Sequence, residues 1–431
     1  MDFRPAIEKA KSAKKILIVS HYDCDGLCSA KILKDALEGE GKQLEILIAK
    51  EVTPEIIREA LTKESDLIIF SDLGSGYLSL MPKDKEIIIL DHHDPETEQV
   101  TENIIQINPC LEKKELCGSG VCYLFAESLN PENSRLIDWA VVGAIGDNQI
   151  EEGENLKVMK QAQKMGRLKV EKGLNIFGHV NRPLSQTLKN SNHIPFNDES
   201  EIVQFLSDLN IDLNHNGKIK SYCDLKDKEK ELLKLEVFKE VIRRGDSDPA
   251  KVFSNIYLLP RNSKKLMDAR EFSTILNAFG RLERYNEAFE MLGGDMDKLE
   301  AVMLEYRQKI ASYLSWTARN LKKFASDDNA LFIDAGDNIH ENMIGTITSI
   351  SINGIAKKGI VIGLANGEGG IKISARSENK NVDLNEILSS VCESLGGYGG
   401  GHAAAAGGKI PPGKSKEFIE AFQNALKTRR G

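Results

Sequence analysis

The sequence predicts an α/β protein with an N-terminal domain built on a parallel sheet, a helical middle region and a smaller C-terminal α/β domain. Three short apolar runs predict the sheet: KILIVS at 15–20, DLIIFS at 66–71 and EIIIL at 86–90. They are rich in Ile, Leu and Val, which is typical of strands buried on both faces. Helix-like stretches separate the runs, and this alternation is typical of parallel β-α-β units.

We assign residues 1–190 to the first domain, and its expected helices alternate with the apolar runs. One helix is predicted at 27–37, and another begins after the Thr-Pro pair that ends at Pro54. Two more are predicted at 119–129 and 136–145. This order of elements predicts a sheet with helices packed on its faces.

Residues 191–325 are predicted to form a helical insertion or connector. Near 299–324, apolar residues recur at steps of three and four, which predicts a long amphipathic helix. Such a helix would either connect two domains or belong to the core of the middle region.

A third domain is predicted at 326–431, where the pattern becomes strand-like with Gly and Asn at the turns. A glycine-rich loop is expected at 396–408, and a final helix at about 414–428. Four segments are expected to be strands: 331–333, 345–352, 359–365 and 370–374.

Composition narrows the class of protein. The 431 residues carry a net charge of −8, with 41% hydrophobic and 28% charged residues, which is ordinary for a soluble protein. The acidic balance argues against coating nucleic acid by bulk charge, but not against a local basic groove. Seven scattered cysteines without a C-x-x-C pair predict free thiols in a reducing cytoplasm. Without a signal peptide or an apolar stretch near the ~20 residues of a membrane span, we expect a soluble cytoplasmic protein with no membrane partner.

Acidic and imidazole side chains gather where the apolar runs end. The first run leads into His21-Tyr22-Asp23-Cys24-Asp25, the second into Asp72, and the third into Asp91-His92-His93. Ligands of parallel sheets bind beyond the carboxyl ends of the strands, so we expect one shared site. One Asp-rich end alone would fit a loop that hydrogen-bonds its own backbone. Three successive ends favour a metal site, and this donor set suits Mn²⁺ or Mg²⁺.

His21, Asp23 and Asp25 are spaced by two residues. On an extended chain, residues two apart project to the same side, so we expect these three to converge and Cys24 to point away. A carboxylate can bridge two metal ions about 3.5–4 Å apart, as in two-metal phosphoryl-transfer sites. The pattern therefore favours two metals over one.

The same residues resemble the motifs of the DHH phosphoesterase superfamily. The motifs are H-x-D-x-D-G at 21–26, an Asp at 72, D-H-H at 91–93 and the pair Gly146-Asp147. A D-H-H triplet alone would be a weak signal, whereas the ordered set is specific. A bacterial form of the first motif begins with Asp where this chain has His21, and either side chain can ligate a metal.

The C-terminal region resembles the associated substrate domain of the RecJ-like branch of that superfamily. The resemblance lies in GGHAAAAG at 400–407 and in Ser374-Ala375-Arg376 before it. Together the motifs of the resemblance fall within residues 1–150 and 325–431, and they follow one another in the expected order. The branch implies a metal-binding domain followed by a domain that binds the substrate.

The resemblance implies two Mn²⁺ or Mg²⁺ ions bridged by Asp72, with Asp91 orienting His92 and with His93 facing the substrate phosphate or leaving group. In the second domain Arg376 and His402 would bind the phosphate, together with Ser374, Gly400 and Gly401. The implied ligands are His21, Asp23 and Asp72 for one metal, and Asp25, Asp72, His92 and Asp147 for the other.

Three further residues each admit two interpretations. Ser119 would meet a phosphate at a helix N-terminus or cap that helix. Arg182 would line a groove to the site or belong to a plain helix start at Pro183. Asn277 lies on a predicted amphipathic helix, where packing and substrate contact both fit.

Four functions fit these motifs. We favour a single-strand-specific exonuclease that hydrolyses DNA or RNA to mononucleotides by a two-metal mechanism; replication or repair proteins as partners follow from the resemblance. Such an enzyme needs a cationic channel with stacking surfaces. The alternatives are a phosphodiesterase of short oligonucleotides or cyclic dinucleotides, a manganese pyrophosphatase, and a catalytically weak scaffold in a replication complex. The Gly-Gly-His motif argues against the pyrophosphatase, and the complete ligand set argues against lost activity.

Overall fold

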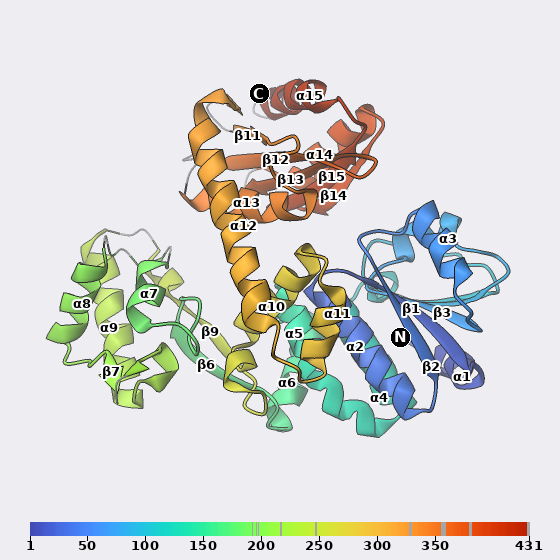
Figure 1. Ribbon diagram of the computed structural model, residues 1–431, viewed down its shortest axis with the longest axis horizontal. Coiled ribbons are helices and arrows are strands. Elements are labelled where there is room, and N and C mark those ends of the chain that lie inside the picture. Colours follow the sequence, from blue (N-terminus) through green and yellow to red (C-terminus); the bar gives the residue numbers. More distant parts are fainter. Residues whose placement is uncertain are drawn as a thin grey trace. The chain divides into compact units, whose positions relative to one another are not determined.

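The computed structural model of the chain (Figure 1) describes two units, Met1–Asp297 and Lys298–Gly431. Within the described residues, no helix combines the length and the apolar composition needed to cross a membrane. The description covers residues 1–431 except 192, 195, 197, 216–217, 246–247, 327–329, 355–358, 379–381 and 429–431.

The first unit is built on a five-stranded, all-parallel sheet with the strand order β2-β1-β3-β4-β5. Its register sets Ser71 level with Ser20 on one side and with Leu90 on the other, so the carboxyl ends of the central strands are aligned. The three predicted strands are confirmed. The strands are β1 Lys15–His21, β2 Gln43–Ala49, β3 Leu67–Ser71, β4 Glu86–Leu90 and β5 Ile104–Ile107.

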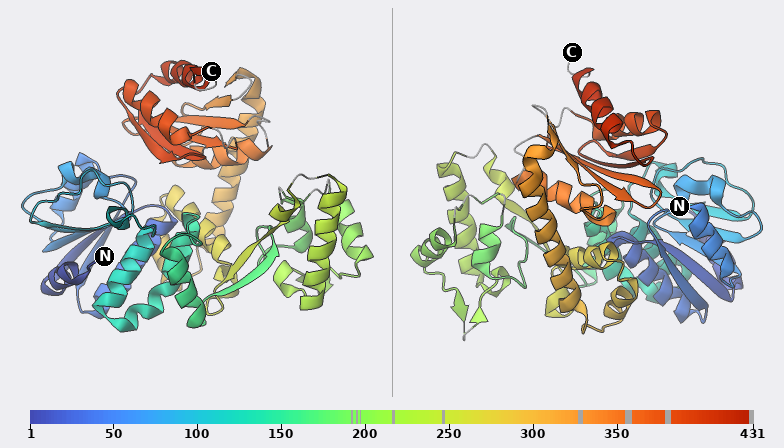
Figure 2. Two further views of the ribbon diagram at one scale, coloured as in Figure 1. Left: turned by 180° about the vertical axis from the view of Figure 1, so that it is seen from behind. Right: turned by 45° about the horizontal axis from the view of Figure 1, so that its top comes forward.

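Helices cover both faces of this sheet, as Figures 1 and 2 show. On one face α2 and α4 contact the central strands, and α5 packs on both helices. On the other face, Leu17, Phe70 and Ile89 form a core with Ile57 of α3. Burial from both sides explains why the central strands are apolar without alternation. The helices of this part are α1 Arg4–Ser12, α2 Cys24–Gly39, α3 Pro54–Thr62, α4 Gly118–Leu129, α5 Ile137–Gly146 and α6 Asn155–Lys164.

A helical insertion is carried by a two-stranded antiparallel ribbon, in which β6 Lys169–Leu174 pairs with β9 Phe253–Leu258. Figure 1 shows the insertion beyond the ribbon, in green. Its helices pack around a core that includes Leu184, Leu206 and Leu233. The predicted helical character of the insertion is confirmed, whereas the two-stranded ribbon was not predicted. The inserted elements are α7 Leu184–Lys189, α8 Glu199–Asp208, β7 Asn214–His215, β8 Lys218–Ile219 and α9 Asp227–Arg243.

After the ribbon the chain returns to the helices of the first sheet. Helix α10, Ala269–Arg281, packs on α5 and α2, and α11, Tyr285–Leu292, packs on α10 and α2. Close packing is possible because Gly280 lies against the carbonyl oxygen of Tyr22, where an added Cβ would overlap that oxygen. The segment before Asp297 therefore supports the loop that follows β1.

The second unit begins with the long helix α12, Leu299–Asn320, which confirms the predicted amphipathic helix. A six-stranded mixed sheet follows, with the order β10-β11-β12-β13-β15-β14. Helices α14 Leu384–Ser394 and α15 Ser415–Thr428 contribute to the core beside this sheet, and α13 Glu341–Gly354 contacts β12 and β13. The strands are β10 Ala325–Ser326, β11 Ala330–Asp334, β12 Ile360–Gly367, β13 Gly370–Ser377, β14 Tyr398–His402 and β15 Ala405–Ile410.

The expected glycine-rich loop at 396–408 is wrong, because most of this segment forms the β14–β15 hairpin. Glycine has no side chain to alternate between faces, so a glycine strand shows no period-two pattern. The glycines allow the backbones of neighbouring segments to approach closely. An added Cβ on Gly401 would lie 2.7 Å from the carbonyl oxygen of Ala405, and Gly401 has a φ of +136°.

The expected strand at 345–352 is also wrong, because this segment belongs to helix α13. Its Ile, Thr and Ser residues favour strands locally, but Ile344, Ile347 and Ser351 recur at helical spacing and are all buried. Two hydroxyls find partners inside the helix: Thr348 Oγ1 donates to the Ile344 carbonyl at 2.7 Å and Ser349 Oγ to the Gly345 carbonyl at 2.9 Å. Burial of one helix face outweighs the local strand propensity.

The helical face of α13 predicts unequal costs for two matched substitutions. Ile347→Ala empties a fully buried site and should lower the free energy of unfolding by about 2–5 kcal/mol. Ile350→Ala changes a residue that is 38% exposed, and should change the free energy of unfolding by about 0.5 kcal/mol or less. Urea unfolding followed by circular dichroism measures both. Equal costs for the two variants would contradict the placement of this face.

Candidate metal centre

The candidate site lies at the carboxyl edge of the parallel sheet. His21 is the last residue of β1, Asp72 follows β3, and Asp91-His92-His93 follow β4. Asp147 is the C-cap of α5 and completes the group from the helix layer. The prediction that strand ends bring these residues together is confirmed.

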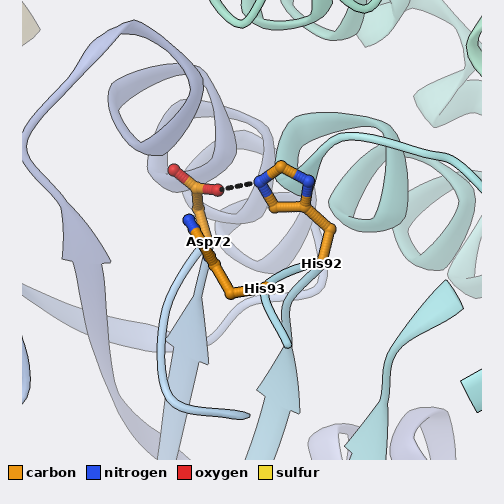
Figure 3. Close-up of side chains that lie close together, drawn as sticks. All are labelled: Asp72, His92 and His93. Carbon is orange, nitrogen blue, oxygen red and sulfur yellow. Dashed lines mark ion pairs between the residues drawn. The ribbon is translucent and has the colours of Figure 1, made fainter. Parts of the chain in front are cut away.

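Asp72 belongs to two groups of potential ligands, one with His21 and Asp23 and one with His92 and His93, and a third group joins His92 to Asp25 and Asp147. In the first, His21 Nδ1 lies 3.1 Å from Asp23 Oδ2 and 3.4 Å from Asp72 Oδ2. In the second, His92 Nε2 lies 3.2 Å from Asp72 Oδ1, and Figure 3 shows the imidazole directed at that oxygen. The same nitrogen is 3.4 Å from Asp147 Oδ2 and 4.0 Å from Asp25 Oδ2. Each oxygen of Asp72 thus faces a different group.

The convergence of His21, Asp23 and Asp25 does not come from an extended chain, so that part of the prediction is wrong. Strand β1 ends at His21 and α2 begins at Cys24, with Asp23 as its N-cap accepting from Gly26 N at 3.1 Å. Asp25 therefore reaches the site from the first turn of a helix. Cys24 turns away, as expected, and its Sγ donates to the Val142 carbonyl at 3.5 Å.

Several buried atoms of the site have no hydrogen-bond partner among the described residues. Such atoms are costly, because burial removes water and nothing replaces it. Divalent cations bound by these side chains would satisfy all of them, and carboxylate with imidazole is a donor set for Mn²⁺ or Mg²⁺. The atoms are His21 Nδ1, Asp25 Oδ2, Asp72 Oδ1, Asp72 Oδ2 and His92 Nε2.

The electrostatics of the site also favour a cation. Burial and the nearby Asp25 carboxylate raise the pKa of Asp72 well above its ordinary value, and the same two causes raise the pKa of Asp147. Burial acts in the same direction on Asp23, but the His21 imidazole outweighs it and lowers the pKa of Asp23. Crowded carboxylates repel one another when ionised, and a bound divalent ion reverses that relation.

Asp72 has a strained backbone. Its φ is +57°, in the left-handed region that costs a non-glycine residue about 1–2 kcal/mol. Its N–H donates to the Leu90 carbonyl at 2.9 Å, which continues the pairing of β3 with β4 past the end of the strand. The left-handed turn at this residue directs the chain away from the sheet at the point where the two ligand groups meet. Such strain is typical of functional sites.

Ser119 positions Asp25, a role that neither sequence interpretation proposed. Its backbone N–H donates to Asp25 Oδ1 at 3.1 Å, and its hydroxyl donates to the same oxygen. The N-cap of α4 is Cys117, so the capping interpretation of Ser119 is wrong. Two hydrogen bonds on Oδ1 leave Oδ2 of Asp25 directed at His92.

Asn277 supports the start of α2 from a distant part of the chain. Its Oδ1 accepts a hydrogen bond from Cys24 N at 3.1 Å, one of the N–H groups that helix geometry leaves unpaired. The structure therefore shows a structural contact for Asn277, beside Asp23, one of the candidate metal ligands.

Asp91 contacts a different ring from the one expected. Its Oδ1 accepts from His93 Nδ1 at 2.8 Å and from the backbone N of His92 at 2.8 Å. Burial would raise the pKa of Asp91, but the His93 imidazole outweighs it and lowers that pKa. The His93 side chain is 53% exposed, against 11% for His92. Asp91 thus holds the His92 backbone and orients the more accessible His93.

In the second unit, the predicted substrate residues lie on adjoining strands. Arg376 on β13 donates from Nε to Ser349 Oγ at 2.9 Å and from Nη1 to Ser374 Oγ at 3.1 Å. Arg376 and His402 are both register partners of Ala405, which places them at one level of the sheet on either side of β15. Gly400 and Gly401 lie beside His402 on β14.

Gly143 is predicted to be essential for the position of Asp25. An added Cβ there would overlap both Ser119 Oγ and Asp25 Oδ1. Gly143→Ala should therefore weaken Mn²⁺ binding by about 10- to 100-fold, the effect typical of disturbing a group that orients a ligand. Titration calorimetry measures it, with Gly39→Ala as the matched control because nothing lies within 4 Å of that added Cβ. A folded Gly143→Ala protein that binds Mn²⁺ normally would contradict the assignment of Asp25.

Three family models match successive parts of the chain. The DHH family N-terminal domain matches residues 15–146, the DHH-CID domain matches 176–252, and the DHHA1 domain matches 327–428. The first match contains all of the metal-binding candidates except Asp147, and the last contains the residues of the β13–β14 region.

Two curated relatives align over nearly the whole chain. An uncharacterised protein of Methanocaldococcus jannaschii is 30% identical over 436 residues, covering 95% of this chain and 93% of that protein. The single-stranded-DNA-specific exonuclease RecJ of Bacillus subtilis is 24% identical over 432 residues, covering 94% of this chain but 45% of RecJ. The chain thus spans less than half the length of this RecJ.

Solved structures share the fold. RecJ of Thermus thermophilus in complex with Mn²⁺ has a TM-score of 0.62 at 19% identity, covering 99% of this chain and 55% of RecJ. CDC45 of Entamoeba histolytica has a TM-score of 0.62 at 12% identity, covering 99% and 98% of the two chains. Together with the ordered family matches and the 30% identical relative, they show that the chain belongs to the DHH superfamily, in its RecJ-like branch.

Proposed function

We propose that the protein is a two-metal phosphodiesterase that releases mononucleotides from single-stranded DNA or RNA. The observation that carries the proposal is the position of Asp72, whose two buried oxygens have no hydrogen-bond partner and each face a different group of ligands. His21, Asp23 and Asp72 would hold one Mn²⁺ or Mg²⁺ ion. Asp25, Asp72, His92 and Asp147 would hold the other. When bound, such ions polarise a phosphoryl group and activate water for in-line attack.

His93 is the residue of this site best placed to touch the substrate. Asp91 occupies its Nδ1, so Nε2 is the ring atom available to bind a phosphate or leaving-group oxygen. The half-exposed position of His93 gives a substrate access to that nitrogen. The role of Asp91 in this proposal is to fix the ring, since its carboxylate is itself buried.

The second unit would bind the phosphate from residues on β13 and β14. Arg376 is held by Ser349 and Ser374, so its guanidinium is oriented before a substrate arrives. A planar guanidinium suits phosphate because it donates two parallel hydrogen bonds. His402 lies level with Arg376, and the adjacent Gly400 and Gly401 allow backbone N–H groups to approach an anion.

The named relatives support this substrate class. The Bacillus subtilis RecJ is specific for single-stranded DNA, and solved RecJ structures hold Mn²⁺ or Mg²⁺. The likeness to CDC45 leads us to propose replication or repair proteins as partners of a cytoplasmic enzyme. A catalytically weak scaffold is a second candidate on the same likeness, but all of the expected ligands lie together in this chain.

Incubation with Mn²⁺ and labelled substrates tests the activity. We expect mononucleotides from single-stranded 20-mers of DNA or RNA, and no turnover when EDTA removes the metal. A dinucleotide, a cyclic dinucleotide and pyrophosphate serve as the competing substrates. Cleavage of a dinucleotide with both 20-mers left intact would overturn the exonuclease assignment, and no cleavage of any substrate would favour the scaffold.

Asp72→Asn is the control that connects the activity to the site. Asn tolerates a left-handed backbone, so the fold is kept while one ligand oxygen is replaced. We expect turnover to fall by more than about 100-fold, beyond the effect of losing an orienting group. Asp84→Asn, at an exposed turn, is the matched variant that should retain activity.

A further inference from the structure

We infer that a polar groove beside Asp147 binds the substrate strand next to the phosphate that is cleaved. The groove lies entirely within residues 1–297, has a volume of about 780 Å³, and begins at Gly146 and Asn148, which flank the metal-binding candidate Asp147. Its volume is within the range of about 300–1,000 Å³ that is typical of ligand pockets. The inference rests on the proposed function and adds a place for neighbouring nucleotides.

One wall of the groove is a row of polar residues along α10. Arg270, Thr274, Asn277 and Arg281 all line it, and their spacing of four, three and four places them on one face of the helix. The rise of the helix puts the two arginines roughly 16 Å apart along its axis. Asn277 also accepts from Cys24 N, so this wall is attached to the start of the metal-binding helix. Cations at both ends of a row suit a chain of phosphates.

A second part of the lining comes from the β6–β9 ribbon, which adds a third cation. Lys172 on β6 lines the groove and is exposed. Arg270 is oriented by two contacts: its Nη1 donates to Ser254 Oγ at 3.4 Å, and its guanidinium lies 5.6 Å from the ring centre of Tyr257.

Two carboxylates also border the groove. Glu151 accepts hydrogen bonds from Asn255 and from the Tyr257 hydroxyl, so one of its oxygens is occupied. Glu152 also lines the groove and is exposed. Three cations against two carboxylates leave the lining with a net positive charge on a protein whose total charge is −8.

Aromatic rings supply the second feature of a single-strand groove. Phe177 and Phe253 line it and are partly exposed. The Arg182 guanidinium lies 4.7 Å from the ring centre of Phe177 and holds that ring. Bases stack on aromatic rings with little sequence preference, which suits an enzyme that processes any single strand.

Binding of a labelled single-stranded 12-mer tests the inference. Fluorescence anisotropy with EDTA present measures affinity without hydrolysis, at several salt concentrations, on the full chain. The double variant Arg270→Ala/Arg281→Ala should bind at least about tenfold more weakly. The slope of log affinity against log salt concentration should become shallower by about 0.7 for each phosphate contact that is lost. The single variant Lys172→Ala, which removes an exposed side chain, should make the same slope shallower by about 0.7. Arg261→Ala removes an exposed arginine outside the groove and should match the unchanged protein.

Two additional readouts separate the possible failures. Circular dichroism and Mn²⁺ titration establish that each variant is folded and keeps its metal centre. If the folded groove variants bind with unchanged affinity and unchanged salt dependence, the groove assignment is overturned, whether or not the protein is a nuclease. If they lose binding while the unchanged protein hydrolyses no phosphodiester, the groove assignment stands and the proposed function fails.

Discussion

The crowding of carboxylates around Asp72 is the constraint on which the rest of the site depends. Asp25 and Asp72 are fully buried, Asp23 and Asp147 lie beside them, and among the described residues only His21 and His92 provide ion-pair contacts to this group. Like charges about 4 Å apart repel by several kcal/mol at the effective dielectric of a protein surface. A folded protein tolerates such a cluster when divalent cations bind in it.

The surrounding chain holds these carboxylates in place. The left-handed turn at Asp72 uses backbone strain, Gly143 leaves room for Asp25, and Ser119 occupies one Asp25 oxygen so that the other faces His92. Asn277 holds the first turn of α2 from a helix more than 250 residues away. The parallel sheet supplies the common edge, and the two helix layers supply the precision that metal ligands require.

The grouping of the candidate ligands at the strand ends could be predicted, because parallel strands end at one edge of the sheet and an Asp or His that follows an apolar run must lie at that edge. Ser119 and Asn277 could not, since their partners lie 94 and 253 residues away and both look like ordinary helix residues. Edge strand β2 alternates in burial and β5 is only four residues long, so neither gives a strong signal. Helix α13 is rich in β-branched residues, which favour strands locally, so its sequence predicts a strand. The β14–β15 hairpin is rich in glycine, which hides the alternation of side chains that marks a strand. The predicted domain limits at 190 and 325 stay predictions.

We propose that Asp72 joins two metal ions in one site. Crystals grown with Mn²⁺ and measured at the manganese absorption edge test it most directly, because anomalous scattering locates each ion independently of the protein. We expect two peaks about 3.5–4 Å apart, both within bonding distance of the Asp72 carboxylate. A single peak, or two peaks that do not share Asp72, would contradict it.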